Sequence, residues 1–398
     1  MSRFHSYLNT SVKLIDQYKG EQPFAIFIKN FFSTEKKYGS KDRKQIAALC
    51  YNYFRLGFAM KKFSVEDRVT MATFLCEQAP SDFLSKIDAA LNQQINLPID
   101  KKLEIVKEKF SALDIFPFEE FLSDAINAEK YSLSMFAQPF LFLRVRPQSK
   151  LTTLKKLEKA KLDHQLLNGN CIQLPPATNA EDFFIIDKEV VIQDYSSQQV
   201  LNYLRINETT IFGEEIKQTP LSGWDCCAAS GGKSILLHDA LKRKIDLTIS
   251  DIRLAIVMNL HQRFKKANIK EYKYFIADIG NNNFKPPATN YQLIICDAPC
   301  TGSGTWGRTP EQLCFFKSEA IKEYSDLQKR IVTNVIPHLK NEGIFVYITC
   351  SVFKAENEAI ANFIKESFDL ELLHQEFFKG FDKRADTMFV SIFKKPLL

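Results

Sequence analysis

The sequence predicts an α/β protein with a doubly wound, mostly parallel sheet in its C-terminal half, preceded by a helical region and a smaller α/β region. The main observation is that, from about Pro220 onward, short apolar runs alternate strictly with longer helical stretches. The apolar runs have strand length and lie at 223–227, 245–250, 272–277, 291–296 and 343–349. This alternation predicts a parallel sheet that binds its ligands at the carboxyl ends of the strands.

The N-terminal and central regions follow different patterns. Beyond Ser40, apolar side chains recur at helical spacing, at Ile46, Leu49, Cys50, Tyr53 and Phe54. From about Pro139 the pattern changes to strand-like pieces around one amphipathic helix at 151–160; these pieces lie at 140–146, 171–174, 183–186 and 190–193. We therefore expect three domains: a helical domain over 1–125, a small α/β domain over 130–215 and the parallel-sheet domain over 216–398.

Composition is that of an ordinary soluble protein, with 45% hydrophobic and 25% charged residues among 398. The longest apolar runs are too short to span a bilayer, and Met1–Asn9 is polar rather than signal-like. We therefore expect no membrane segment and a cytoplasmic location. The net charge of +6 is compatible with a polyanionic partner but does not establish one. Nothing in the sequence demands more than a monomer.

The nine cysteines are scattered and odd in number. Free thiols in a reducing compartment are therefore the simpler interpretation than a disulfide framework. Cys296 and Cys300 are four residues apart, but Cys296 ends an apolar run and no second ligand pair stands at zinc spacing. We expect no metal site.

A turn rich in small residues follows the first strand of the C-terminal half, at Ala228, Ala229, Ser230, Gly231, Gly232, Lys233 and Ser234. Two glycines and the start of a helix let a ligand approach the backbone closely. The turn is neither a Walker loop, which needs glycine where Cys227 stands, nor the G-x-G-x-x-G dinucleotide fingerprint. Neither nucleotide motif therefore explains the turn, and the acidic residues at the strand ends become the informative feature.

Acidic residues end three successive strands: Asp251 the second, Asp278 the third and Asp297 the fourth. Any one of them is more commonly the N-cap of the next helix. Together, beside the glycine turn, they match the ribose hydroxyls, the adenine amine and the ammonium group of S-adenosylmethionine. The sequence therefore predicts S-adenosylmethionine as the cofactor.

Two cysteines also follow strand ends, Cys300 after an Asp-Ala-Pro turn and Cys350 after the fifth strand. A cysteine in a strand is more often a small core residue than a nucleophile. Both, however, lie where a doubly wound sheet places its ligands, and a nearby helix N-terminus favours a thiolate. We therefore take both as candidates for covalent chemistry.

Three longer segments carry a resemblance to the Fmu/Sun family of RNA cytosine-5 methyltransferases. They are Asp225–Lys233, Asp297–Thr305 with Arg308, Pro310 and Glu311, and Tyr347–Ser351 followed by Glu356–Glu358; Val191–Gln198 resembles the segment before the cofactor turn. The N-terminal region, with Asp42, Arg43, Leu49–Tyr51 and Arg55, resembles more weakly the NusB-like domain of the bacterial 16S ribosomal RNA members, and the central region looks like a small RRM-like domain.

The resemblance implies a mechanism and assigns roles by motif. Cys350 is the nucleophile that adds to carbon 6 of the cytosine, Asp297 stabilises or protonates N3, and Cys300 acts in the release step. The implied cofactor contacts are Cys227, Ala228, Ala229, Ser230, Gly231, Gly232, Lys233, Asp251, Asp278 and Asp297. Two positions depart from the family pattern: Ser230 replaces a proline, and Gly307 stands where an arginine is common. The implied partner is unpaired or flipped-out RNA, in ribosomal RNA or an assembly particle.

Two alternatives stay open from the sequence. A DNA cytosine methyltransferase would use the Pro-Cys motif, with Cys300 as the nucleophile, although the complete Thr-Cys-Ser351 segment argues against it. A non-catalytic RNA-binding assembly factor would keep the fold without the chemistry, although both cysteines, the glycine turn and all three acids are present. Neither the modified cytosine nor the state of the RNA substrate follows from the sequence.

Overall fold

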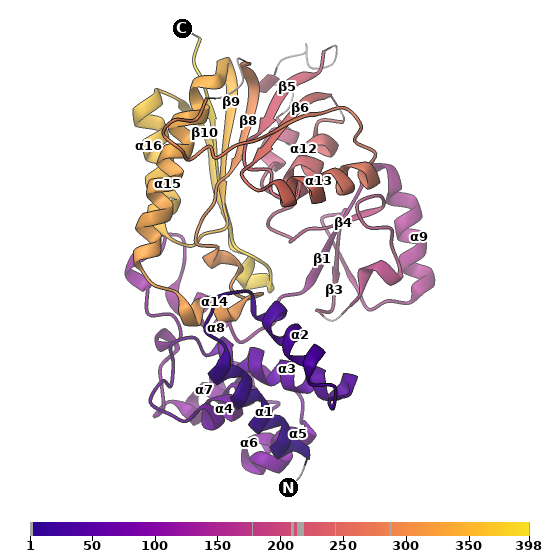
Figure 1. Cartoon of the computed structure of the whole chain (residues 1–398), viewed down its shortest axis with the longest axis vertical. Helices are drawn as coiled ribbons and strands as arrows, with labels where there is room; N and C mark the ends of the chain where they lie inside the picture. Colours follow the sequence, from indigo (N-terminus) through magenta and orange to yellow (C-terminus); the bar gives the residue numbers. More distant parts are fainter. Residues whose placement is uncertain are drawn as a thin grey trace. The chain divides into compact units, whose positions relative to one another are not determined.

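A computed structural model describes residues 3–176, 178–207, 211–212, 219–242, 244–285 and 289–397. The chain divides into two compact units, and each is formed by two separate segments. Unit 1 comprises Met1–Gln138 and Thr305–Ser318, and unit 2 comprises Pro139–Gly304 and Glu319–Leu398. Figure 1 labels their helices and strands. No helix in the described part of the chain is long and apolar enough to cross a membrane. The division into three domains stays a prediction.

Unit 1 is helical, as the apolar spacing predicts. Its helices are α1 (Arg3–Gln17), α2 (Phe24–Thr34), α3 (Ser40–Arg55), α4 (Val65–Cys76), α5 (Asp82–Ile87), α6 (Ala89–Gln93), α7 (Ile99–Val106), α8 (Ala128–Ser134) and α14 (Pro310–Phe315). Ser64 caps α4 by accepting a hydrogen bond from the Asp67 amide. The apolar face of α3 is buried, with Ile46, Leu49 and Phe54 at most 1% exposed.

Helix α14 comes from the second segment of unit 1, which the sequence pattern did not reveal. Glu311 accepts a hydrogen bond from the Phe24 amide at 3.2 Å, and a Cβ added at Gly57 would lie 2.8 Å from the Leu313 side chain. Trp306 is buried beside Phe116. The segment 305–318 is therefore an integral part of the helical core, although it follows the Cys300 turn in the sequence.

The smaller sheet of unit 2 contains β1 (Leu141–Val145), β2 (Gln165–Leu167), β3 (Cys171–Leu174) and β4 (Val190–Ile192) in the order β2-β3-β1-β4, antiparallel throughout. Helix α9 (Lys150–Ala160) contributes Leu157 to a core with Leu143 and Ile172. The strand expected over 183–186 is wrong, because this segment forms only one bridge, between Ile186 and Val190. A short 3-10 turn, Ala180–Asp182, precedes it, and the RRM-like description stays a prediction.

The larger sheet confirms the predicted doubly wound architecture. Its order is β10-β11-β9-β8-β5-β6-β7, in which β5 (Leu221–Asp225), β6 (Ile245–Asp251), β7 (Lys273–Ile276), β8 (Tyr291–Asp297) and β9 (Leu339–Thr349) are parallel. The sequence pattern did not single out β10 (Glu371–Phe378) and β11 (Met388–Lys394), which add an antiparallel edge next to β9.

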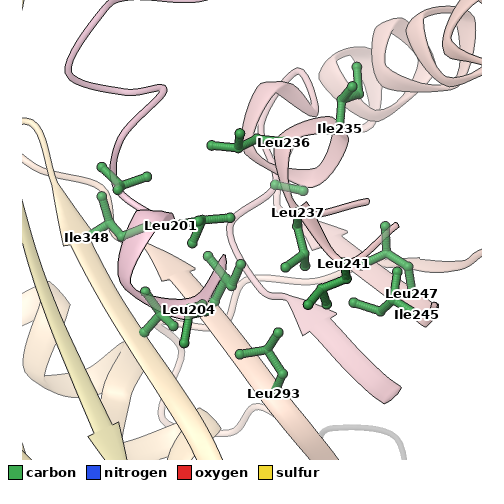
Figure 2. Packing of buried hydrophobic residues seen from close by; sticks show 14 of the residues in the cluster. Leu201, Leu204, Ile235, Leu236, Leu237, Leu241, Ile245, Leu247, Leu293 and Ile348 are labelled. Atoms are coloured by element: carbon green, nitrogen blue, oxygen red, sulfur yellow. The ribbon is translucent and has the colours of Figure 1, made fainter. Parts of the chain in front are cut away.

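Helices cover both faces of this sheet (Figure 1). On one face, α12 (Gly232–Ala240), α13 (Leu254–Ala267) and the short α10 (Asn202–Ile206) pack onto apolar strand residues. Figure 2 shows Leu204, Leu237, Leu241 and Leu293 among the residues of this core. On the other face, α15 (Glu319–Val335) and α16 (Glu358–Phe368) pack onto Trp224, Phe345 and their neighbours. The two cores hold the strand ends in fixed register.

A buried ion cluster connects the smaller sheet to α12 and α13 within unit 2. Asp239 on α12 accepts hydrogen bonds at 2.7 Å from Arg144 and from Arg146, both on the smaller sheet side. Arg146 also donates to the Ala267 carbonyl at the end of α13, at 2.6 Å. The side chains of all three charged residues are at most 6% exposed. One carboxylate therefore compensates two buried guanidinium groups.

We expect Asp239→Asn to lower the free energy of unfolding of the protein by about 3–5 kcal/mol, because it leaves two buried positive charges without a counter-ion. Denaturant-induced unfolding measures this change. The matched control is Asp246→Asn, which breaks the exposed pair with Lys273 and is expected to cost about 0–1 kcal/mol. Equal effects of the two substitutions would contradict the role given to the buried cluster.

Candidate active site

A cavity of about 470 Å³ opens at the carboxyl ends of the central strands of unit 2. Ends of β5, β6, β8 and β9 contribute to its wall, together with residues of α15. Its lining includes Cys226, Cys227, Asp251, Asp278, Asp297, Cys300, Tyr324 and Cys350. The structure thus brings the three predicted acids and both predicted reactive cysteines to one place, as expected for parallel strands whose carboxyl ends share an edge.

The turn after β5 is held in an unusual backbone conformation. Ala229 has a φ of 45° and Gly231 a φ of 82°, both in the left-handed region. A Cβ at Gly231 would lie 2.8 Å from the Leu260 side chain, so only glycine fits against α13 here. Asp251 at the end of β6 fixes the turn by accepting a hydrogen bond from the Ala229 amide at 3.0 Å.

Arg263 on α13 holds the next residue of the turn. Its Nη1 donates to the carbonyl oxygen and to the hydroxyl of Ser230, at 2.9 and 3.0 Å. The other edge of the guanidinium pairs with Asp187 of the smaller sheet region at 2.8 Å, and the Asp187 side chain is 4% exposed. Arg263 thus holds Ser230 in place, at the position where the Fmu/Sun family pattern has a proline. The sequence gives no signal for Arg263, because its two partner residues, Asp187 and Ser230, come from distant parts of the chain.

Two further pairs join the start of α12 to the strand ends. Lys233 Nζ lies 2.6 Å from Asp297 Oδ2, and the Ser234 hydroxyl donates to buried Asp225 at 2.6 Å. Burial opposes the charge on Lys233, but the Asp297 carboxylate more than offsets it and raises the pKa of the ammonium group. Lys233 therefore stays protonated beside Asp297, which lines the cavity.

The remaining acids are held by local contacts. Asp251 Oδ1 accepts from the amide and the Nε of Arg253, at 3.0 and 3.2 Å. Asp278 Oδ1 accepts from the Gly280 amide at 3.0 Å, which turns the chain after β7. Asp278 therefore stabilises a local turn, and its carboxylate accepts a backbone hydrogen bond as the carboxylate of an N-cap would. It also lines the cavity.

The sulfur atoms of Cys300 and Cys350 lie 3.4 Å apart. The hydrogen bond to the Cys350 sulfur, together with burial, raises the pKa of Cys300 well above its ordinary value. Cys300 therefore stays protonated at neutral pH. At this distance a proton can pass directly between the two sulfur atoms.

Glu356 ties together the two turns that carry these cysteines. Its carboxylate accepts from the amide and hydroxyl of Thr301, at 2.9 and 2.7 Å, and from the Ser351 hydroxyl at 2.6 Å. Gln328 on α15 donates to the same carboxylate at 3.1 Å and to the Pro299 carbonyl at 2.9 Å. Burial raises the pKa of Glu356, although these donors oppose the shift. The sequence shows Glu356 only as part of a motif, and it gives no signal for Gln328.

The backbone of Gly304 packs closely against the Cys350 turn. Its amide donates to the Cys350 carbonyl and its carbonyl accepts from the Thr387 amide, both at 2.8 Å. A Cβ at this position would lie 2.3 Å from the Thr387 carbonyl and 2.9 Å from that of Cys350. Gly304 is thus needed for the close packing of the two backbones. Gly307, the second departure from the family pattern, belongs to unit 1.

Sequence comparisons match the C-terminal part of the chain to ribosomal RNA methyltransferases. Residues 218–392 match the model of the family "16S rRNA methyltransferase RsmB/F". Identity is 29% over 196 residues to ribosomal RNA small subunit methyltransferase B of Serratia proteamaculans, covering 47% of this chain and 41% of the relative. It is 28% over 208 residues to the probable ribosomal RNA small subunit methyltransferase B of Bacillus subtilis, covering 52% and 44%. The chain thus spans less than half the length of these curated relatives.

Solved structures resemble the chain in fold. The crystal structure of PH0851 has a TM-score of 0.69 at 17% identity and covers 98% of both chains. The structure of NSun6 from Pyrococcus horikoshii with SFG has a TM-score of 0.58 at 13% identity and covers 72% of this chain and 97% of that one. At these identities the likeness shows the fold alone, and it agrees with the Rossmann-like larger sheet.

Asp225, the buried carboxylate that accepts the hydrogen bond of Ser234, makes the stability of the fold depend on pH. Burial raises its pKa from 3.8 to about 7, although the Ser234 hydroxyl opposes the shift. The folded state therefore binds more protons than the unfolded state between about pH 4 and pH 7, and ionised Asp225 lowers stability progressively across that window. We expect the stability of Asp225→Asn, relative to the original protein, to increase from pH 4 to pH 7 and to level off above. Thermal unfolding at a series of pH values measures the difference, and a pH-independent difference would contradict this account.

Proposed function

We propose that the chain methylates carbon 5 of a cytosine in RNA, through a covalent adduct with Cys350, since residues 218–392 match the model of the RsmB/F methyltransferase family. The observation that carries this proposal is the pair of thiols, 3.4 Å apart, in the same cavity as Asp251, Asp278 and Asp297. Small-subunit ribosomal RNA is the proposed substrate, since the relatives are ribosomal RNA small subunit methyltransferases.

The cofactor of this family is S-adenosylmethionine, and the cavity fits it. The fit rests on a backbone turn that only glycine and small residues allow, with carboxylates around it. Asp251 would accept from the ribose hydroxyls, Asp278 from the adenine amine, and Asp297 would face the ammonium group; the turn from Cys227 to Lys233 would line the cofactor. When bound, S-adenosylmethionine supplies an electrophilic methyl group.

Cys350 acts first in the proposed reaction. Its thiolate sulfur forms a bond to carbon 6 of the cytosine, and the displaced electron pair makes carbon 5 nucleophilic. The amide of Gly304 and the network of Glu356 fix the turn that carries this sulfur. Held in this way, Cys350 reaches the base with little loss of conformational freedom at the moment of reaction.

Asp297 and Cys300 handle the protons. Asp297 is proposed to stabilise or protonate N3 as negative charge develops there, while Lys233 holds its other side. After methylation, the proton on carbon 5 passes to the solvent, its electron pair restores the double bond to carbon 6, and the bond between carbon 6 and Cys350 breaks. Cys300, kept protonated by its contact with Cys350, is placed to donate its proton to that sulfur as the bond breaks, so that Cys350 leaves as the thiol. This places the two cysteines in consecutive steps of one reaction.

Methyl transfer from labelled S-adenosylmethionine to ribosomal RNA of cells lacking this protein tests the proposal. Label is expected in 5-methylcytidine, and Cys350→Ala is expected to lower the rate by about a thousandfold or more, as loss of a nucleophile does. Cys300→Ala is expected to accumulate the covalent protein–RNA adduct. Cys171→Ala, at another buried free cysteine, is the control. An adduct lost with Cys300→Ala and kept with Cys350→Ala would instead indicate the DNA-type mechanism, and absence of cofactor binding by calorimetry would indicate a non-catalytic factor.

Arg263 is expected to position the cofactor turn. In Arg263→Lys a single ammonium group cannot pair with Asp187 and also donate twice to Ser230, so we expect the Kd for S-adenosylmethionine to rise by about tenfold. The rate at saturating cofactor is expected to change little, because Arg263 does not line the cavity. Calorimetry measures the Kd, with exposed Arg205→Lys as the matched control. An unchanged Kd would refute this positioning role.

A further inference from the structure

Three thiols other than the reactive pair come together beside the cavity. Each of Cys226, Cys227 and Cys296 offers a sulfur atom, and the three atoms lie within 4.8 Å of one another. The spacing in the sequence hides this group, because Cys296 stands 70 positions after Cys226. The expectation of no metal site depended on that spacing.

Strand register explains why the group forms. β5 and β8 are parallel neighbours in which Asp225 pairs with Ile295, and the Cys226 amide donates to the Ile295 carbonyl at 2.9 Å. Paired residues of adjacent strands point to the same face of a sheet. Cys226 and Cys296 therefore both enter the core below α15, where they are 1% and 0% exposed, and Cys227 adds its sulfur from the first residue of the turn.

The surroundings favour a ligand that is soft, small and positively charged. Neighbouring core residues such as Trp224 and Ile294 are apolar. The nearby oxygen atoms have partners of their own: the Tyr347 hydroxyl donates to the Glu356 carbonyl, and Asp225 and Asp297 accept from Ser234 and Lys233. In the part of the chain that the structure describes, the group includes no fourth His, Asp or Glu ligand atom, whereas structural zinc is held by four ligands. Thiolates select soft cations, and univalent copper is the biological example. Cys226 and Cys227 line the cavity, which gives a path of entry.

We propose that Cys226, Cys227 and Cys296 form a binding site for a soft univalent cation of the Cu⁺ type, coordinated by the three sulfur atoms. Coordination replaces the protons of the ionising thiols, which pass to the solvent; no electron is transferred, so no oxidant or reductant takes part. The proposal goes beyond the methyl-transfer reaction and does not depend on it.

The test uses the full chain with Cys300→Ala and Cys350→Ala, since this second thiol pair in the same cavity would otherwise bind copper too. The protein is loaded anaerobically with Cu⁺ and gel-filtered, and copper is counted by elemental mass spectrometry. About one ion per chain is expected, with near-ultraviolet absorption from sulfur-to-copper charge transfer. Zn²⁺, offered in competition, is expected not to displace it.

Two variants in this background identify the ligands. Cys296→Val keeps the core filled, and Cys227→Ser tolerates its half-buried position; each is expected to weaken Cu⁺ binding by about tenfold or more. Cys50→Val, at a free cysteine that is 0% exposed in unit 1, is the matched control and is expected to bind copper unchanged. Thermal unfolding verifies that each variant is folded. No retained copper, retention unaffected by both ligand variants, or preference for Zn²⁺ would overturn the proposal.

Discussion

Parallel pairing of β5, β8 and β9 is the constraint on which the rest of the site depends. Each of these strands ends at the same edge, and the register pairs Asp297 at the end of β8 with Ile348 near the end of β9. The turns that leave these strands are therefore neighbours, whatever their distance in the sequence. Because the strands are buried on both faces by apolar cores, this register cannot slip without exposing core side chains.

Hydrogen bonds to buried polar groups then hold the neighbouring turns in a fixed arrangement. Glu356 receives donors from the Thr301 and Ser351 turns and from α15, so one carboxylate sets the separation of the two cysteines. Asp251 and Arg263 do the same for the glycine turn from opposite sides. In such networks the hydrogen bonds strengthen each other in a low dielectric, and the groups need little reorganisation during a reaction.

The sequence was informative where function depends on local pattern. Alternation of apolar runs predicted the parallel sheet, and strand-end residues such as Asp251, Asp297, Cys300 and Cys350 could be placed together from that alone. It was uninformative where partners come from distant segments. Gln328 and Arg263 stand on amphipathic helices where a polar residue has many uses, and the antiparallel β10 and β11 carry no motif. The thiol group of Cys226 and Cys296 depends on cross-strand register, which spacing does not encode.

The chain passes between the two units three times, so they cannot be separated by one cut in the sequence. The chain leaves unit 2 after Gly304, contributes α14 to the helical core, and returns at Glu319. A deletion that removed the first 138 residues would leave buried groups such as Trp306 and Leu313 without the core that covers them, on a segment that begins five residues after Cys300. Because the helical unit consists of two separate segments, recombination at a single point of the gene cannot transfer it whole. We therefore expect the two units to be inherited together.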